Sequence, residues 1–227
     1  MSSFQPIYER AAIRKGGEAE LISLLSGKPK SADQLAAIPD DRYLAEMTRR
    51  IFSAGFVWQV INDKWANFER AFHQFDININ ASMPDEVLEG LTSDKSIVRN
   101  GQKIFTVRDN AKFIQKIAAE HGSFGRFFAD WPVHDQVELL DVLKKGGKRL
   151  GGNSAQYFMR FMGKDSFILS KDVIATLVDA GVIDNYKATS KRDLKAIQSA
   201  FNAWHEETGH TYTNLSRIAA MSIDSPS

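Results

Sequence analysis

The run KKGGKRLGGNSAQ, Lys144–Gln156, holds the residue types best suited to bind an anion. Its first nine residues contain four cationic side chains and four glycines. Glycine lets the backbone approach a phosphate closely, and lysine and arginine supply full positive charge. The run is therefore either a phosphate site lined by backbone or a mobile, solvated turn, and both interpretations fit its composition.

Nucleotide-binding motifs do not fit this run. A P-loop has the pattern Gly-x-x-x-x-Gly-Lys-[Ser/Thr] after a strand, but no Lys-Ser or Lys-Thr follows these glycines and no strand is expected before them. A dinucleotide fingerprint requires the same strand. The sequence therefore favours the backbone of a polynucleotide over a free nucleotide.

A zinc-hydrolase interpretation of the histidines is disfavoured by their spacing. In His205-Glu-Glu-Thr-Gly-His210 the two histidines lie about 140° apart around a helix, and Gly209 is expected to end that helix between them. His73, His121 and His134 have no metal-ligand spacing. The chain has no cysteine, which excludes disulfides, thiolate-ligated zinc and cysteine nucleophiles. We expect no metal and no cofactor.

Length and composition are those of a folded protein with a sizeable core. The chain has 227 residues, of which 43% are hydrophobic. Its formal net charge of +1 excludes a globally basic nucleic-acid binder but allows a local basic face. No apolar run approaches the roughly 20 residues that span a membrane, and the N-terminus lacks the apolar core of a signal peptide. We therefore expect a cytoplasmic protein without a membrane partner.

Helical periodicity dominates the chain. In Ser190–Trp204 the apolar residues fall three or four apart, and Ser190 with Asp193 resembles a capping box. Similar stripes occur in Tyr43–Phe52, Trp65–Phe75 and Ile104–Ala118. No segment alternates with period two between hairpin turns. These features predict an all-α chain of about ten short helices.

The glycine-rich basic run lies between two predicted helices. The first begins at His134 and ends near Lys144, and the second covers Asn153–Met162. Their apolar stripes are Val137, Leu140 and Leu143 in the first helix, and Tyr157, Phe158, Phe161 and Met162 in the second. The start of the second helix adds partial positive charge beside the glycines. The pattern predicts a helical hairpin whose connection either holds one DNA strand by its backbone without reading its sequence or is a mobile, solvated turn.

Three groups of residues carry a resemblance to known proteins. Leu150-Gly-Gly-Asn-Ser-Ala155 resembles the helix-hairpin-helix motif of DNA glycosylases. Ala54-Gly-Phe-Val-Trp58, followed by Lys64, Asn67, Phe68 and Phe72-His-Gln-Phe-Asp76, resembles the DNA-3-methyladenine glycosylase I family. Ile97-Val-Arg-Asn-Gly-Gln-Lys-Ile104 and Asn110-Ala111 are similar to further elements of that family. Together these pieces cover most of residues 40–175.

The resemblance implies an all-α helix-hairpin-helix DNA glycosylase fold, with two helical lobes around a DNA-facing cleft. The whole chain, 1–227, is then a single glycosylase unit with its hairpin at 134–162. The implied function is a monofunctional glycosylase that flips an alkylated purine of the 3-methyladenine type out of DNA and hydrolyses its glycosidic bond in base-excision repair. The implied partner is double-stranded DNA carrying an alkylated base, and we expect a monomer.

Two alternatives remain open at this point. One is a catalytically silent helix-hairpin-helix protein that only binds DNA, and the other is a glycosylase for a different modified base. Cleavage of the strand is not expected, because bifunctional relatives carry a Schiff-base lysine two residues before the alanine of the hairpin, where this chain has Asn153.

The resemblance also implies residues for the base. Trp58 stands at the pocket tryptophan of the family, and Tyr8 lies in a Pro-Ile-Tyr context similar to its N-terminal pocket tyrosine. A cationic base against an aromatic face gains about 1–2 kcal/mol when desolvated; the alternative for both rings is core packing. The pocket glutamate of the family falls at Arg50, so Glu46 and Glu9 are candidate substitutes.

Asp172 is the candidate catalytic residue. In the wider superfamily an aspartate after the hairpin stabilises the sugar cation and can activate water. The register also allows Ser170 at this place, in which case the chain lacks the group, and Asp172 alternatively fits a helix N-cap. For the DNA backbone the candidates are Lys148, Arg149, Gly151, Gly152, Ser154 and Lys171. The family's zinc site uses cysteines, which are absent here.

Overall fold

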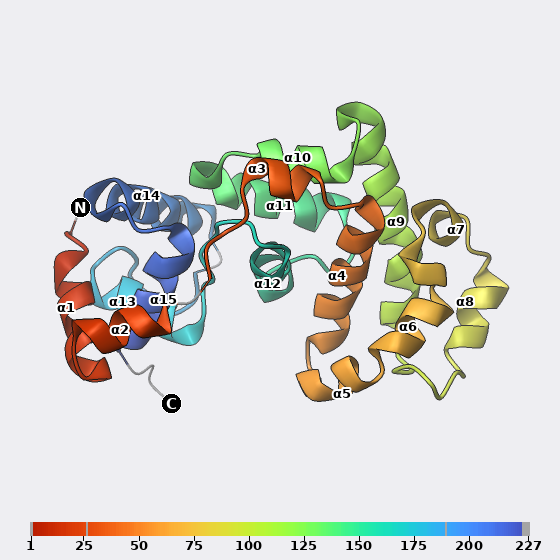
Figure 1. Cartoon of the computed structure of the whole chain (residues 1–227), viewed down its shortest axis with the longest axis horizontal. Coiled ribbons are helices and arrows are strands. Elements are labelled where there is room, and N and C mark those ends of the chain that lie inside the picture. Colours follow the sequence, from red (N-terminus) through yellow and green to blue (C-terminus); the bar gives the residue numbers. More distant parts are fainter. Residues whose placement is uncertain (1, 26, 189, 224–227) are drawn as a thin grey trace. The chain divides into compact units, whose positions relative to one another are not determined.

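The computed structural model describes residues 2–25, 27–188 and 190–223, and within these ranges all regular secondary structure is helical. It forms fifteen α-helices and two short 3-10 helices, with no strand in the described ranges (Figure 1). The all-α expectation is confirmed. None of the described helices combines the length and the apolar character needed to cross a membrane.

The chain divides into two compact units, each made from segments far apart in sequence. The first unit comprises Met1–Lys30, Pro132–Leu139 and Gly163–Ser227, and the second comprises Ser31–Trp131 and Leu140–Met162. Helix α11 (Gln136–Gly146) contributes to both units, since the division falls after Leu139.

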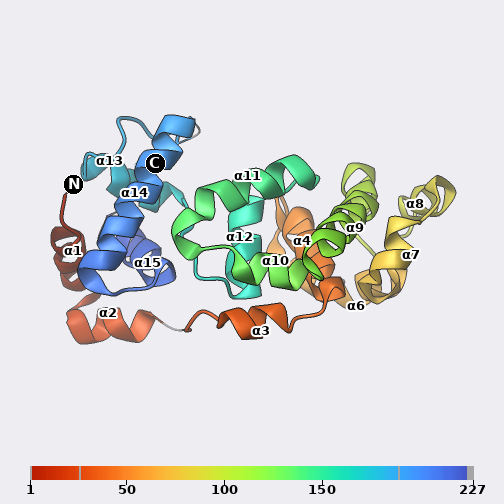
Figure 2. The ribbon, with the colours of Figure 1, turned by 90° about the horizontal axis from the view of Figure 1, so that it is seen from above.

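The first unit packs helices from both ends of the chain together. Its elements are α1 (Gln5–Lys15), α2 (Glu18–Leu24), η2 (Val133–Asp135), α13 (Lys171–Asp179), α14 (Lys191–Thr208) and α15 (Tyr212–Ser222). Its core joins Phe4 on the N-terminal side to Phe167, Phe201 and Trp204. The Trp204 indole N–H donates to the carbonyl of Ser2 at 3.0 Å, and α1 lies against α15 (Figures 1 and 2). The N-terminal helices are therefore part of this core.

The second unit is rich in buried aromatic rings. Its elements are α3 (Ala32–Ala36), α4 (Asp40–Ser53), α5 (Trp58–Asp63), α6 (Trp65–Ala71), η1 (His73–Phe75), α7 (Ile77–Ala81), α8 (Asp85–Leu91), α9 (Gly101–His121), α10 (Phe124–Asp130) and α12 (Asn153–Met162). The fully buried Tyr43 ring of α4 contacts Phe124 at 5.2 Å, Phe128 at 5.3 Å and Phe158 at 6.3 Å between centroids. Phe158 thereby anchors α12 to α4.

Helix boundaries match the sequence pattern in α14 and depart from it after α6. Helix α14 begins after Ser190, whose hydroxyl accepts from the N–H of Asp193 at 3.0 Å, and it ends at Gly209 with a φ of 69°. The predicted helix Trp65–Phe75 instead ends at Ala71. After Phe72, which caps the helix, the residues His73–Phe75 have φ values of 51°, 56° and 61°, so this left-handed turn stops the helix. The buried Phe75 ring still stacks on Trp65.

Candidate functional site

The glycine-rich run forms the connection of a helical hairpin in the second unit. Helices α11 and α12 both lie within the predicted range 134–162, and residues 147–152 connect them. A Cβ on Gly146 would lie 2.2 Å from a ring carbon of Phe113, and one on Gly147 would lie 2.6 Å from Leu150. These two glycines are therefore required by packing inside the protein.

The other two glycines of the run lie on its open side. A Cβ on Gly151 would meet only the aliphatic part of Lys144, at an ordinary 3.6 Å. Gly152 has a φ of 54° and nothing within 4 Å of the added atom. Lys148, Arg149 and Gly152 are exposed, while Gly151 and Ser154 are half-buried. The predicted phosphate-binding groups of this loop are thus accessible.

Asn110 of α9 holds the connection in place. Its side-chain oxygen accepts from the N–H of Lys148 at 2.7 Å, and its amide donates to the carbonyl of the same residue at 3.2 Å. Asn110 is fully buried. Arg149, in the left-handed region with a φ of 57°, donates to the side chain of Gln102. The loop therefore has a fixed backbone whose charged side chains remain exposed.

We expect Asn110→Ala to lower the free energy of unfolding by about 2 kcal/mol, because a buried backbone N–H loses its acceptor. Urea unfolding measures this change. Asn78→Ala, on an exposed side chain of α7, is a control expected to stay within about 0.5 kcal/mol of the wild type. A loss no larger than that of the control would contradict the role assigned to Asn110.

The apolar stripes of the hairpin differ in part from the predicted ones. In α11 the buried apolar residues are Leu139 and Leu143, whereas Val137 and Leu140 are only half-buried. In α12 Phe158 and Met162 are buried as expected, but Phe161 is 48% exposed. Tyr157 is half-buried. Phe161 and Tyr157 therefore belong to a surface cluster that periodicity assigned to the core.

This surface cluster, which we call the aromatic–arginine cluster, consists of Trp58, Tyr157, Phe161, Arg50 and Glu46. The Trp58 ring is 41% exposed and meets the rings of Tyr157 and Phe161 edge-on, at 5.4 Å and 5.5 Å between centroids. The Arg50 guanidinium lies over both Trp58, at 4.9 Å, and Phe161, at 4.0 Å. Core packing, the alternative for Trp58, is not what the structure shows.

The charges of the cluster are largely buried. Arg50 is 6% exposed, and its Nε lies 2.7 Å from Oε1 of Glu46, one helical turn earlier on α4. Burial lowers the pKa of Arg50 and raises the pKa of the Glu46 carboxyl, the latter against the opposing effect of Arg50 and Arg49. Glu46, the candidate substitute for a pocket glutamate, is therefore already paired with the arginine that stands at the glutamate position.

The raised pKa of Glu46 makes stability depend on pH in a defined direction. A carboxyl with a raised folded-state pKa stabilises the fold while protonated and loses this contribution as pH rises through that pKa. The quantity compared is the unfolding free energy of Glu46→Gln minus that of the wild type. We expect this difference to increase as pH rises from below 4.5, the ordinary pKa of a glutamate side chain, toward neutrality. Urea unfolding at several pH values measures the difference. A difference that is constant or that falls with pH would contradict the expectation.

Exposed apolar residues continue from this cluster into the turn between α4 and α5. Phe56 is 40% exposed and Val57 is 71% exposed. The buried Lys103 of α9 fixes the turn, because its ammonium donates to the carbonyl of Ala54 at 2.6 Å and that of Phe52 at 3.3 Å. Burial lowers the pKa of Lys103. The run Phe56-Val57-Trp58 was a sequence signal for this surface, since such residues are rarely adjacent in an exposed turn.

Two of the predicted base-binding residues lie in the first unit. Tyr8 of α1 is half-buried; its hydroxyl donates to Glu18 at 2.7 Å, and its ring stacks on His210 at 5.9 Å. Burial and Glu18 raise the pKa of Tyr8. Glu9 is exposed and accepts from Gln5 at 2.9 Å.

The candidate catalytic residue also lies in the first unit, at the start of α13. Ser170 is the N-cap of this helix, and its hydroxyl accepts from the N–H of Val173 at 3.2 Å. Asp172 lies within the first turn and is half-buried, so the N-cap role considered for it belongs to Ser170. Lys171 is exposed beside it. The assignment of Asp172 to catalysis stays a prediction.

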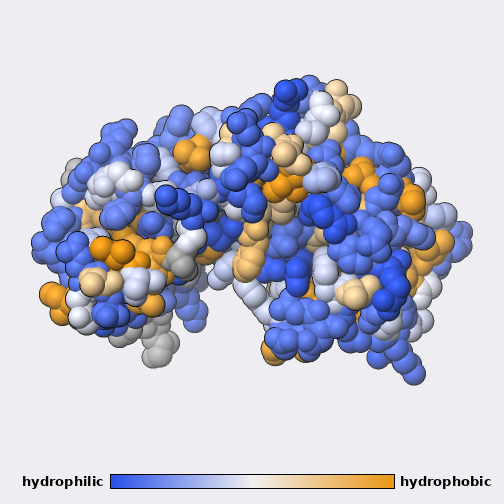
Figure 3. Space-filling model, viewed as in Figure 1, coloured by the Kyte–Doolittle hydropathy of each residue, from blue (hydrophilic) through white to orange (hydrophobic). Residues whose placement is uncertain are grey.

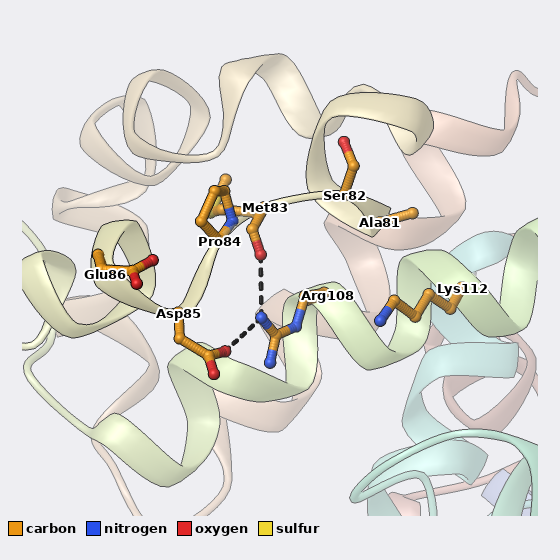
Figure 4. A pocket seen from close by; sticks show the side chains of 8 residues that line it. All are labelled: Ala81, Ser82, Met83, Pro84, Asp85, Glu86, Arg108 and Lys112. Carbon is orange, nitrogen blue, oxygen red and sulfur yellow. Dashed lines mark hydrogen bonds and ion pairs between the residues drawn. The ribbon is translucent and has the colours of Figure 1, made fainter.

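A separate hollow of about 390 Å³ lies in the second unit where the turn between α7 and α8 meets α9 (Figure 4). Arg108 donates across it to the carbonyl of Met83 at 2.9 Å and pairs with Asp85. Its lining holds none of the predicted site residues. Over the described residues no group of three or more histidines and carboxylates is placed to hold a metal ion.

One segment of the chain, which contains helix α4 with Glu46 and Arg50, matches a known protein family. Residues 36–147 match the model of the methyladenine glycosylase family. This segment belongs to the methyladenine glycosylase family. The match includes Glu46, Arg50, Trp58 and Asn110, while Tyr8, Asp172 and most of the hairpin connection lie outside it. The resemblance to this family that was expected from the sequence is confirmed for residues 36–147.

The chain is also similar to solved structures over a longer stretch than the family segment. The 3-methyladenine DNA glycosylase I of Staphylococcus aureus, solved to define its recognition of 3-methyladenine, is 19% identical with a TM-score of 0.50, covering 69% of this chain and 90% of its own. The 8-oxoguanine DNA glycosylase of Methanocaldococcus jannaschii is 15% identical with a TM-score of 0.55, covering 94% and 92%. At these identities the likeness establishes the helix-hairpin-helix glycosylase fold, as expected from the sequence.

Proposed function

We propose that this protein is a monofunctional DNA glycosylase that flips a modified purine out of duplex DNA and hydrolyses its glycosidic bond. Alkylated purines are the first substrate class, because the matched family is that of the methyladenine glycosylases. The observation that carries the proposal is the aromatic–arginine cluster, which presents the half-exposed rings of Trp58, inside the family segment, and of Phe161, on α12 beyond it. Exposed aromatic faces are suited to stack on an unpaired base.

The hairpin supports DNA binding in this proposal. Its connection offers Lys148 and Arg149 for phosphates and exposes the backbone at Gly151 and Gly152. A loop of this kind contacts the DNA backbone irrespective of sequence. One glycosylase with this fold, the 8-oxoguanine glycosylase/lyase of M. jannaschii, was solved in complex with a 15-mer DNA. We infer that this chain binds duplex DNA as a monomer through its own hairpin, α11 and α12 with their connection.

The turn before Trp58 has a part in extracting the base. Val57 is the most exposed of the apolar residues that precede the cluster, and Lys103 fixes the backbone that carries it. Apolar side chains inserted between base steps unstack them and kink the duplex. We assign Val57 and Phe56 to the space that the flipped nucleotide vacates. Unstacking costs a few kcal/mol, least at a damaged base.

Hydrolysis then needs stabilisation of the sugar cation and a positioned water. Asp172 is the carboxylate we assign to this role. Asn153 stands where a Schiff-base lysine would be required for strand cleavage, so the product is an intact strand with an abasic site. On the resemblance alone, we assign Tyr8 and Glu9 to the base and Lys171 to the DNA backbone.

Base release from defined DNA tests the proposal. Duplexes with methylated purines, and a duplex with a single 1,N6-ethenoadenine, are incubated with the protein; free base and alkali-labile abasic sites are measured. Asp172→Asn is expected to slow release by about a hundredfold while leaving DNA binding unchanged. Asp179→Asn, on the same helix, is the matched control.

A catalytically silent DNA-binding protein is the second candidate. The pairing of Glu46 with Arg50 favours it, because no unpaired carboxylate of the cluster is left to face a cationic base. Tight binding to damaged duplexes with no free base from any of them would establish this alternative and refute the enzyme.

A further inference from the structure

Arg50 lies directly behind the aromatic faces that we assign to the base. Its guanidinium carbon is 4.0 Å from the centre of the Phe161 ring and 4.9 Å from that of Trp58, and the side chain is 5% exposed. Trp58 and Phe161 themselves are 41% and 48% exposed. A base that stacks on them therefore has a fixed protein cation on the far side of the same rings.

The cation is only partly compensated by its neighbours. Glu46 contributes the one carboxylate, at 2.7 Å from Nε of Arg50. Arg49 adds a second guanidinium on the same helix, over the Trp65 ring at 4.9 Å and bonded to Asn62. Two guanidinium groups thus face one carboxylate, and the region behind the rings carries net positive charge.

Arg50 also has a hydrogen-bond donor without an acceptor. Its Nη1 is buried and makes no hydrogen bond to any described residue. A buried donor without a partner is costly, and an incoming lone pair would relieve that cost. Trp58 and Phe161, whose rings lie over the guanidinium, are 41% and 48% exposed, and we assign a lone pair of the bound base as the acceptor for this donor.

We propose that Arg50 makes the site selective for neutral modified purines that present a lone pair, a ring nitrogen or a carbonyl oxygen, and unfavourable for cationic ones. A cation stacked on these rings meets like charge and a π face already polarised by Arg50, whereas a neutral base gains a charge-assisted hydrogen bond. Etheno adducts of adenine belong to the favoured class. Purine nucleotides methylated at N3 or N7 carry a positive charge and belong to the disfavoured class. This inference rests on the proposed function and replaces methylated purines, its first substrate class, by neutral modified purines.

Binding measurements separate the charge preference from catalysis. Anisotropy titrations compare a duplex with one 1,N6-ethenoadenine, which is neutral, and a duplex with one 2′-fluoro-7-methylguanine, which is cationic and resists hydrolysis; an unmodified duplex gives the background. For the wild type we expect the neutral base to bind about tenfold tighter, or more, than the cationic one, because juxtaposed like charges are strongly disfavoured.

Two variants and one control test the role of Arg50. Arg50→Gln is expected to reduce the ratio of the two dissociation constants to near one. Glu46→Gln leaves Arg50 in place but removes the compensating charge, and is expected to increase the ratio. Arg49→Gln, the control, removes the second guanidinium, which lies over Trp65 and not over Trp58 or Phe161, and is expected to lower the ratio less than Arg50→Gln does. Thermal unfolding verifies that each variant is folded.

The outcomes distinguish this inference from the proposed function. Equal or tighter binding of the cationic duplex by the wild type overturns the inference, as does a ratio that neither Arg50→Gln nor Glu46→Gln changes. Release of methylated bases as fast as ethenoadenine also overturns it, while upholding the glycosylase. The expected binding preference without release of any base would uphold the selectivity and refute the enzyme.

Discussion

Trp58→Ala is expected to slow single-turnover base release by roughly thirtyfold, because loss of a stacking face costs about 2 kcal/mol at a flipped base. The ring is 41% exposed and contacts Tyr157 and Phe161 by their edges, so its removal leaves the core of the second unit intact. We therefore expect little change in the thermal midpoint. Trp58→Phe, which keeps an aromatic face, is expected to retain most of the rate.

Val60→Ala is the matched control for this experiment. Val60 lies on the same helix, α5, and is also 41% exposed, but it has no part in the aromatic–arginine cluster. Its substitution is expected to change release by no more than about twofold. Equal effects of Trp58→Ala and Val60→Ala would show that the ring does not hold the base.

Gly151→Ala is expected to weaken duplex binding by about tenfold without affecting stability. The added methyl meets only the side chain of Lys144 at 3.6 Å, and the φ of Gly151 is not positive, so the free protein accommodates it. On the DNA side, however, the methyl occupies the space in which a phosphate approaches the backbone. Fluorescence anisotropy gives the affinity, and urea unfolding gives the stability.

A second glycine supplies the control for Gly151. Gly90 of α8 has open space around an added Cβ and no positive φ, and it lies in the same unit. Gly90→Ala is expected to leave DNA affinity unchanged. Lys148→Ala should reduce the slope of log affinity against log salt by about one, whereas Gly151→Ala should leave that slope unchanged. Unchanged affinity for Gly151→Ala would mean that the phosphate does not approach at this glycine.

The sequence predicts much of this fold because local signals and tertiary contacts agree. Ser190 begins α14 and Gly209 ends it, as the capping and glycine rules require. Helix α12 runs over the predicted range Asn153–Met162. In contrast, the left-handed turn at His73–Phe75 carries no glycine and continues a helical pattern. Buried packing of Phe75 on Trp65, rather than local preference, accounts for its conformation.

The candidate site is harder to predict for a physical reason. Periodicity identifies an apolar face but not its partner, so Phe161 on α12 was assigned to the core together with Phe158. Only the fold shows that Phe161 meets Trp58, from a distant part of the chain. The burial of Arg50 is equally hard to predict from the sequence, because it depends on rings contributed by two other helices. In the view of Figure 3, hydrophobic residues appear as separate groups among hydrophilic ones.

The packing of both chain ends into one core has a consequence during protein synthesis. The second unit is complete once residue 162 has been translated, because it draws on nothing beyond Met162. The first unit instead waits for α14 and α15, since Phe4 packs against Trp204 and its N–H donates to Glu207. Helix α1, which precedes the second unit in the chain, therefore packs into its core only after that unit has been translated, and on a translating ribosome the second unit is free to fold before it.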